Sequence, residues 1–375
     1  MATAAPFRPV SEPAVIERLS TLDRFLPAWI IAAMAAGLGL GAIIPRLNHA
    51  LSSVEIAGTS LPIAIGLLLM MYPVLARVRY EELGRLRAER RLFVSSLILN
   101  WLIGPALMFA LAWLLLPDQP AYRTGLIIVG LARCIAMVLI WSDLACADRE
   151  ATAVLVAINS VFQIVAYSFL GYFYITLLPT WLGLDSQGFH IGLWPVARTV
   201  LIFLGIPLAA GYLTRLGGLR ARGVQWYEER FLPRIGPIAL YGLLFTIVVL
   251  FALQGRQITH HPLDVVRIAA PLLIYFAVMF SVSFAWGRGL HLGYARTATL
   301  AFTAASNNFE LAIAVAIGVF GATSGEALAG VVGPLIEVPV LVGLVYVSLW
   351  ARRYFTPAST EQILSAPAPV ARHEA

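Results

Sequence analysis

Two otherwise apolar stretches of the chain hold the polar residues best suited to chemistry. Arg133 and Cys134 lie in the first stretch, and Asn307 and Glu310 lie in the second. A charged side chain at the centre of a membrane-spanning helix costs about 2.5–3.5 kcal/mol on insertion scales, so such residues are functional candidates by default. A thiolate binds soft, thiophilic centres, and an acid shielded from water can exchange a proton. Together these residues predict carriage of a thiol-seeking solute with a proton involved.

Cys134 is the candidate ligand of that solute, although a cysteine can also simply pack between helices. Arg133 favours the thiolate form through its charge. The two side chains diverge by about 100° on a helix, so we expect Arg133 to act electrostatically while it faces another partner. Cys146 is predicted about 18 Å further along a straight helix, beyond the reach of a disulfide or a shared ligand. One thiol therefore predicts one labile bond and no permanent metal cage.

Glu310 is the candidate proton carrier. It shares one face of a predicted helix with three other polar residues, Thr303, Ser306 and Asn307. Two interpretations stay open: a titrating acid that loads and unloads a proton, or a structural ion pair with Arg133 or Arg198. Asn307 and Asn308 offer donors and acceptors to a neutral hydroxylated solute.

Three further side chains are weighed as parts of the site. Trp141 lies seven residues after Cys134 and is expected on the same helical face, where it walls the site or anchors at the membrane interface. Glu337, an acid between two prolines, is expected to join a proton path or to pair with Arg198. Asp143 lies near the end of its span, and its role stays open.

The composition predicts an all-α polytopic membrane protein. Of 375 residues, 60% are hydrophobic and only 12% are charged, and the mean hydropathy is +0.83. All 26 basic residues are Arg, which excludes the lysine of an ATP-hydrolysing phosphate loop and of a retinal Schiff base. The sequence contains no nucleophile–base pair or metal triad, so we expect neither an enzyme nor a cofactor. The charge of +6 does not predict nucleic-acid binding, because the arginines lie in loops between spans.

Apolar windows of about 20 residues predict ten membrane-spanning helices. Within the fifth, Asn159 and Gln163 are expected to form inter-helix hydrogen bonds rather than to act as ligands. The expected limits are 27–45, 60–77, 92–116, 122–146, 149–178, 191–214, 235–254, 264–287, 296–320 and 328–351.

Arginine placement predicts the direction of the chain in the membrane. Twenty arginines fall in the tails and loops of one side, and four fall in the opposite loops. The positive-inside rule therefore puts both termini in the cytoplasm. We expect disordered tails at 1–24 and 355–375 around a ten-helix transporter domain at 25–354. The first span is expected to be an uncleaved signal anchor.

Short matches indicate an internal repeat, with halves at roughly 25–180 and 190–353. Pro62-Ile-Ala recurs at Pro237, Arg123-Thr recurs at Arg296, and Glu150-Ala recurs at Glu326, at offsets of 175, 173 and 176. Five spans per half require the halves to be inverted, as in many secondary transporters. The 173 offset matches Cys134 with Asn307 and Met137 with Glu310.

Several long motifs resemble the ACR-type arsenite efflux permeases, of the superfamily that includes bile-acid/sodium symporters. The similarity runs from about Leu22 to Arg353, and its motifs are 62–73, 79–83, 130–138, 303–317 and 333–339. The resemblance implies two inverted five-helix repeats in which interrupted spans four and nine cross at the centre. It implies that Cys134 is the required thiol and Glu310 the acid of the ninth span. The segment after Trp141 departs from many members, which puts a role for Asp143 in doubt.

The expected function is export of trivalent arsenic, arsenite and in some members antimonite, in exchange for protons at the plasma (inner) membrane. Cys134, Asn307, Glu310, Arg133 and Trp141 are expected to bind the substrate, with As(III) on the Cys134 sulfur. Glu310 and Glu337 are expected to couple protons, and the other partner is membrane lipid. The alternative is a sodium-coupled symporter of an organic anion, although such an anion does not need a cysteine.

Overall fold

The computed structural model describes residues 25–44, 55–56, 59–79, 90–135, 137–184, 192–260 and 262–355. The predicted disordered tails lie outside these residues, apart from Phe355. Helices occupy each of the ten expected spans. Five helical runs are long and apolar enough to cross a membrane, and three shorter apolar helices accompany them. The helical membrane-protein fold is therefore confirmed.

In the described part of the first half, six helical runs match the first five expected spans. The fourth span is broken into two runs, and the third is one run of three consecutive elements. The spans are formed by α2 (Leu26–Ile43), α4 (Leu61–Ala76), α5 (Arg90–Ile98) continuing through η3 (Leu99–Ile103) into α6 (Gly104–Leu115), α7 (Pro120–Leu131) with α8 (Met137–Leu144), and α9 (Arg149–Tyr172) continuing through η4 (Phe173–Leu177) into α10 (Leu178–Trp181). A short antiparallel pair, β1 (Glu55–Ile56) and β2 (Thr59–Ser60), precedes α4.

The described elements of the second half begin with α11 and end with η7. Its elements are α11 (Leu193–Val200), η5 (Leu201–Gly205), α12 (Ile206–Trp226), η6 (Tyr227–Phe231), α13 (Leu232–His260), α14 (Pro262–Gly289), α15 (Gly293–Ala305), α16 (Phe309–Phe320), α17 (Gly325–Ala351) and η7 (Arg352–Tyr354).

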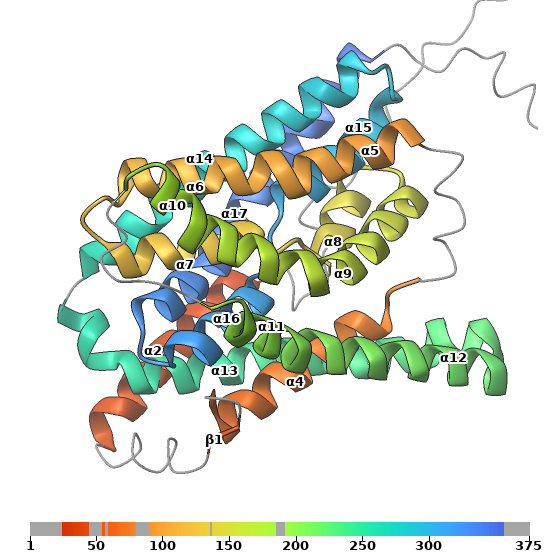
Figure 1. Cartoon of the computed structure of the whole chain (residues 1–375). Helices are drawn as coiled ribbons and strands as arrows, with labels where there is room; N and C mark the ends of the chain where they lie inside the picture. Colours follow the sequence, from red (N-terminus) through yellow and green to blue (C-terminus); the bar gives the residue numbers. More distant parts are fainter. Residues whose placement is uncertain are drawn as a thin grey trace, which may run out of the picture.

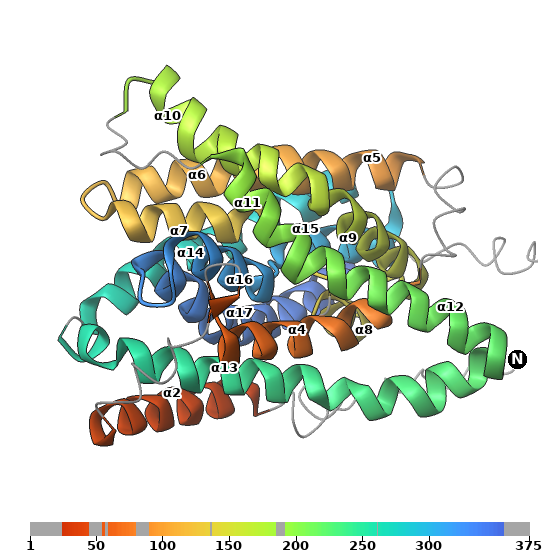
Figure 2. The ribbon, with the colours of Figure 1, turned by 60° about the horizontal axis from the view of Figure 1, so that its bottom comes forward.

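The segment 215–234, expected to be a loop, is helical apart from one turn. α12 continues to Trp226, and the reversal occurs at Gly223, whose φ of 79° and ψ of 170° lie in a region that suits glycine. Figure 2 shows α12 and α13 extending together as a hairpin beyond the other helices. The loop prediction failed because arginines on a solvated helical face resemble those of a loop.

The helices form two outer groups with a central set between them. In both ribbon views α2, α4 and α13 lie on one side, α5, α6 and α9 lie on the other, and α7, α16 and α17 lie between them (Figures 1 and 2). Within the first group α13 packs on α2 and α4, and α12 packs on α4. These backbones approach closely at small residues: a Cβ on Gly211 would lie 2.8 Å from the Ala76 nitrogen. Small residues allow such approach between helices in lipid.

Helices of the central set and of the second group surround the polar residues singled out above. α14 packs on α15, α17 and α6, while α17 packs on α7 and α16. α11 contacts both α9 and α16, so it packs against one outer helix and one helix of the central set. The broken pairs α7–α8 and α15–α16 therefore lie inside the molecule, held on several sides by longer helices.

Candidate functional site

Both chemically promising stretches interrupt a helix. α7 ends at Leu131, and Ala132 follows with an extended backbone (φ −81°, ψ 114°). α15 ends at Ala305, and Ser306 follows with φ −83° and ψ 149°. The helices resume at Met137 and Phe309. The interruption of spans four and nine, implied by the family resemblance, is confirmed.

The two breaks cross and pair with each other. Arg133 and Asn307 form an isolated antiparallel β-bridge. The Asn308 N–H donates to the Ala132 carbonyl at 3.0 Å, and the Asn307 side-chain amide donates to the carbonyls of Val129 (2.8 Å) and Ala132 (3.2 Å). The last carbonyls of a helix have no intrahelical partner, so Asn307 caps α7 from the other span.

Each break also receives an acceptor from the span that follows it. The Arg133 N–H donates to Gln163 Oε1 at 3.1 Å, and the Asn307 N–H donates to Glu337 Oε1 at 3.2 Å. Both pairs are 30 residues apart, and an offset of 174 relates one pair to the other. At the crossing this offset matches Cys134 with Asn308, whereas the sequence offset of 173 had matched it with Asn307.

The Cys134 thiol lies at the crossing and caps the helix that follows. Its Sγ accepts the Val138 N–H at 3.3 Å, and the residue is 2% exposed. The matching Asn308 side chain accepts the Leu311 N–H at 3.0 Å in the same way. A thiol in this position is held by backbone contacts rather than merely packed between helices.

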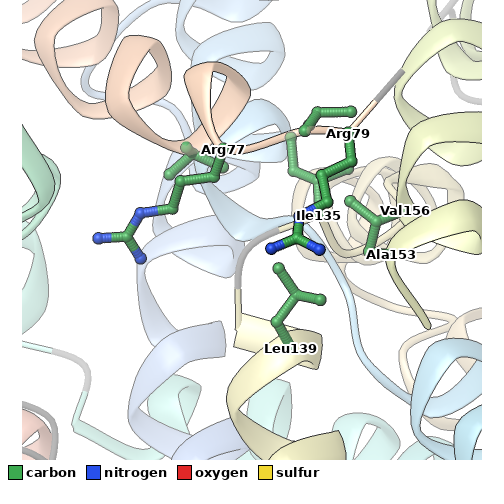
Figure 3. A pocket seen from close by; sticks show the side chains of 8 residues that line it. Arg77, Arg79, Ile135, Leu139, Ala153 and Val156 are labelled. Atoms are coloured by element: carbon green, nitrogen blue, oxygen red, sulfur yellow. The ribbon is translucent and has the colours of Figure 1, made fainter. Parts of the chain in front are cut away.

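A small hollow reaches the residue next to the thiol. It lies between the end of α4 and the α8–α9 pair, and it is lined by Val74, Arg77, Val78, Arg79, Ile135, Leu139, Ala153 and Val156. Figure 3 shows the Arg79 guanidinium directed toward Ile135 and Leu139, while Arg77 points away from them. Arg79 is held by Glu228, whose Oε2 accepts its Nη2 at 2.7 Å. The hollow therefore lies between a charged end of the molecule and the residue that follows Cys134.

Arg133 is directed toward α14. Its fully buried guanidinium donates through Nη1 to the Tyr275 hydroxyl of α14 at 2.9 Å. A Cβ on Gly104 of α6 would lie 2.9 Å from the same nitrogen. Side chains of neighbouring residues in an extended segment point to opposite sides, so direct contact of Arg133 with a solute on Cys134 is not favoured. Sequence reasoning missed Tyr275 and Gly104, since no spacing links them to Arg133.

The two acids lie near each other, beside the second break. Glu310 is half-buried in the first turn of α16, and Glu337 on α17 is 3% exposed. Their carboxyl groups are close enough for their charges to interact. Among the described residues neither acid forms an ion pair with Arg133 or Arg198, and Arg198 is exposed on α11. The structural ion pair weighed from the sequence is therefore not formed.

Two helical-face predictions were wrong because the helices break. Thr303 lies in α15 and Ser306 directly follows that helix. Their hydroxyls donate to the carbonyls of Thr299 and Phe302, whereas Glu310 belongs to α16. The spacing of Trp141 from Cys134 likewise defines no shared face, because Cys134 precedes α8. Trp141 is only 1% exposed, so its position does not suit an interfacial anchor.

The remaining polar candidates lie away from the crossing or pack between helices. Asp143 pairs with Arg149 at 3.5 Å at the end of α8. Asn159 accepts the indole N–H of Trp101 at 3.2 Å. The predicted inter-helix role of Asn159 and Gln163 is thus confirmed. Across the described part of the chain, no three His, Cys, Asp or Glu side chains gather in a way that could hold a metal ion.

The comparisons with known proteins agree on one family. The sodium bile acid symporter family matches residues 64–261. The chain is 59% identical, over 89% of its length and 90% of the relative's, to the arsenical-resistance protein Acr3 of Corynebacterium glutamicum. It is 32% identical to the Acr3 of Alkaliphilus metalliredigens, over 90% and 95% of the two chains. It is also 36% identical to an uncharacterized transporter of Synechocystis, over 87% and 88%.

A thiol and two acids lie at the crossing of two broken membrane helices. The sequence similarity extends over most of this chain and most of each relative. The chain therefore belongs to the sodium bile acid symporter family, as a member of its Acr3-type arsenical-resistance transporters.

Proposed function

We propose that this chain exports trivalent arsenic from the cytoplasm in exchange for protons, with antimonite as a second cargo. The observation that carries the proposal is the buried Cys134 thiol at the crossing of two broken helices. A soft thiolate prefers a thiophilic metalloid to hard cations. The two relatives named as arsenical-resistance proteins support the same cargo.

The binding step is an exchange of ligands on arsenic. As(OH)3 enters as a neutral molecule, and the Cys134 sulfur forms a bond to arsenic as one arsenic–oxygen bond breaks. The thiol proton leaves with the displaced hydroxide as water. Release is the reverse: water returns a hydroxyl group to arsenic and a proton to sulfur. Arsenic stays trivalent throughout, so the cycle needs neither an oxidant nor a reductant.

Two unpartnered amide atoms suit the hydroxyl groups left on arsenic. Asn307 Oδ1 and Asn308 Nδ2 are buried and have no hydrogen-bond partner in the described part of the chain. One accepts and the other donates, which matches the two capacities of a hydroxyl group. Buried polar atoms without partners cost free energy, so a hydroxylated solute would recover part of that cost. Trp141, buried in α8, is proposed to wall this space.

Proton coupling is assigned to the acids Glu310 and Glu337. Two neighbouring carboxyl groups hold one proton more readily than they both ionise. A protonated Glu337 keeps an acceptor oxygen, so it can load a proton without giving up its bond to the Asn307 N–H. Arg133 is assigned an electrostatic role, because its guanidinium is directed to Tyr275. Its positive charge favours the thiolate during binding.

The proposed orientation puts both termini in the cytoplasm of the inner membrane. It is supported by the arginine distribution and by the positive-inside rule. The hollow beside Ile135 and Arg79 would then be the cytoplasmic approach to Cys134. Two inverted repeats are proposed to rock about the crossing, and the offset of 174 between its two hydrogen-bonded pairs supports this division.

The test of the cargo is arsenite uptake into inside-out membrane vesicles under an imposed pH gradient. We expect Cys134→Ser to reduce uptake to the level of vesicles without the protein, because a hydroxyl cannot replace the soft sulfur ligand. The matched control is Cys146→Ser, in a turn away from the crossing. Undiminished uptake by C134S at normal protein abundance would reject the thiol role.

The test of coupling is the effect of a protonophore and of Glu310→Gln. We expect the protonophore to abolish uphill arsenite movement in the unmodified protein. In Glu310→Gln the remaining arsenite flux should no longer respond to the pH gradient, since the amide cannot carry a proton. Solute uptake that depends on sodium and ignores arsenite would instead favour the organic-anion symporter.

A further inference from the structure

The hydrogen bonding of the first break singles out Gln163. This side chain on α9 is fully buried, and its Oε1 accepts the Arg133 N–H at 3.1 Å. Arg133 directly precedes Cys134 and is the residue that bridges to Asn307. The N–H belongs to the rigid peptide unit that joins Ala132 to Arg133, so this bond restrains the backbone directly before Cys134.

At the second break a side-chain oxygen also accepts a backbone N–H, but that oxygen belongs to a different chemical group. There the acceptor of the matching N–H, that of Asn307, is Glu337. A protonated carboxylic acid and a primary amide present the same pattern, one acceptor oxygen and one donor. The halves therefore share a hydrogen bond, but only the half without the thiol has an ionisable acceptor.

Charge explains this difference. An ionised carboxylate at position 163 would accept a hydrogen bond from the residue directly before Cys134, and a nearby negative charge disfavours a thiolate. An amide supplies the same acceptor with no charge. We infer that Gln163 is a positioning residue for Cys134, the neutral counterpart of Glu337, which holds the thiol in place without opposing its ionisation. The inference rests on the proposed function only in treating the Cys134 thiol as the working group.

The other titratable side chains considered around the first break do not place a carboxylate beside the Cys134 thiol. Arg133 donates to Tyr275 of α14, and the Tyr167 hydroxyl of α9 donates to the Ile128 carbonyl of α7 at 2.8 Å. Arg198 of α11, which packs on α9, is exposed. A carboxylate placed at 163 would thus be a new acidic group beside the thiol. The Gln163 Nε2 atom is also buried without a partner in the described part of the chain.

The experiment measures the rate at which N-ethylmaleimide alkylates Cys134 in the purified full-length protein, from pH 6 to pH 9 and without arsenite. Peptide mass spectrometry separates Cys134 from Cys146, which serves as an internal control at the far end of α8. The variants are Gln163→Glu and Gln163→Leu. Ser160→Ala is the matched control, because the Ser160 hydroxyl bonds only within α9, to the Val156 carbonyl.

We expect Q163E to displace the pH profile of Cys134 alkylation toward higher pH by about one unit, a tenfold lower rate at a fixed pH below the plateau. Q163L removes the acceptor, so Cys134 alkylation should become at least about threefold faster as the break loosens, equivalent to about 0.7 kcal/mol of lost restraint. S160A should match the unmodified protein, and Cys146 should react equally in all variants.

A purely structural Gln163 would lower thermal stability without moving the pH profile, so a Q163E profile that coincides with the unmodified one overturns the inference. Q163E keeps the acceptor oxygen and tests the idea even if Q163L fails to fold. Adding arsenite to the unmodified protein tests the proposed function separately, through protection of Cys134. Loss of that protection, with the Q163E displacement intact, would reject the cargo but keep the positioning role.

Discussion

Replacing Asn307 by alanine should loosen the crossing of the two broken helices. The Asn307 side chain donates to the carbonyls of Val129 and Ala132. These two hydrogen bonds join a side chain of span nine to the carboxyl end of α7 in span four. Alanine keeps the backbone bridge to Arg133 but removes both donors.

The expected loss is about 1–3 kcal/mol, from two hydrogen bonds of about 0.5–1.5 kcal/mol each. The full penalty of a stranded acceptor does not apply, because each carbonyl keeps another donor. The Val129 carbonyl still accepts the Ala132 N–H at 3.1 Å, and the Ala132 carbonyl still accepts the Asn308 N–H. Inter-helix bonds measured in membranes average about 0.6 kcal/mol, which favours the lower half of the range.

The assay compares thermal unfolding of purified Asn307→Ala, Asn307→Asp and Ser306→Ala in the same detergent. Ser306 is the matched control, since among the described residues its hydroxyl bonds only to the Phe302 carbonyl of α15. Asn307→Asp should lose more stability than Asn307→Ala, because an ionised carboxylate cannot donate and would face two carbonyl oxygens. Arsenite export by Asn307→Ala should fall more than about tenfold, as small displacements of reacting groups cost this much.

The result that would refute this reasoning is an Asn307→Ala protein as stable as Ser306→Ala. Equal stability would mean that the side-chain caps contribute nothing and that packing of the surrounding helices alone maintains the breaks. An Asn307→Asp protein more stable than Asn307→Ala would contradict the direction assigned to these hydrogen bonds.

Two further predictions concern packing and the surface. Gly333→Ala should lower the free energy of unfolding by about 1–3 kcal/mol or more, because its Cβ would lie 1.7 Å from the Phe309 ring. The control is Gly343→Ala on the same helix, whose Cβ meets nothing within 4 Å. Equal unfolding temperatures of the two variants would contradict the close packing of α17 on α16. The hydrogen bond from Arg267 lowers the pKa of the exposed Asp118 carboxyl, so the ionised pair should persist as pH falls through the ordinary range of Asp. The small stability difference between the unmodified protein and Asp118→Asn should therefore be the same at pH 7 and pH 5, and it should shrink only as the pH falls below the ordinary Asp pKa of 3.8 toward the lowered one. A difference that fades between pH 7 and pH 5, or that stays unchanged in strong acid, would contradict the pairing.

The positions of the spans could be predicted because lipid imposes a simple rule on side chains. Runs of about 20 apolar residues are needed to cross the membrane, and all ten predicted runs coincide with helices. The rule weakens where arginines lie on a helix outside the lipid, so segment 215–234 was predicted as a loop although it is mostly helical.

The candidate residues could be named from the sequence, but their mutual geometry could not. Cys134, Asn307 and the two acids stood out because polar groups in apolar runs are costly. The direction of Arg133 toward Tyr275 depends on an extended backbone that no local pattern announces. The wrong helical faces of Thr303 and Trp141 have the same cause.

The sequence by itself determined that this protein is a helical membrane protein with one thiol and a few acids inside its apolar runs. Those conclusions need only composition, spacing and the cost of burying charge. Only the tertiary structure decided where spans four and nine break, since Ala132 and Ser306 are residues that ordinarily continue a helix. A helix can end inside a membrane only if its free carbonyls find donors, and here Asn307 and Asn308 supply them to the end of α7 from a span more than 170 residues away.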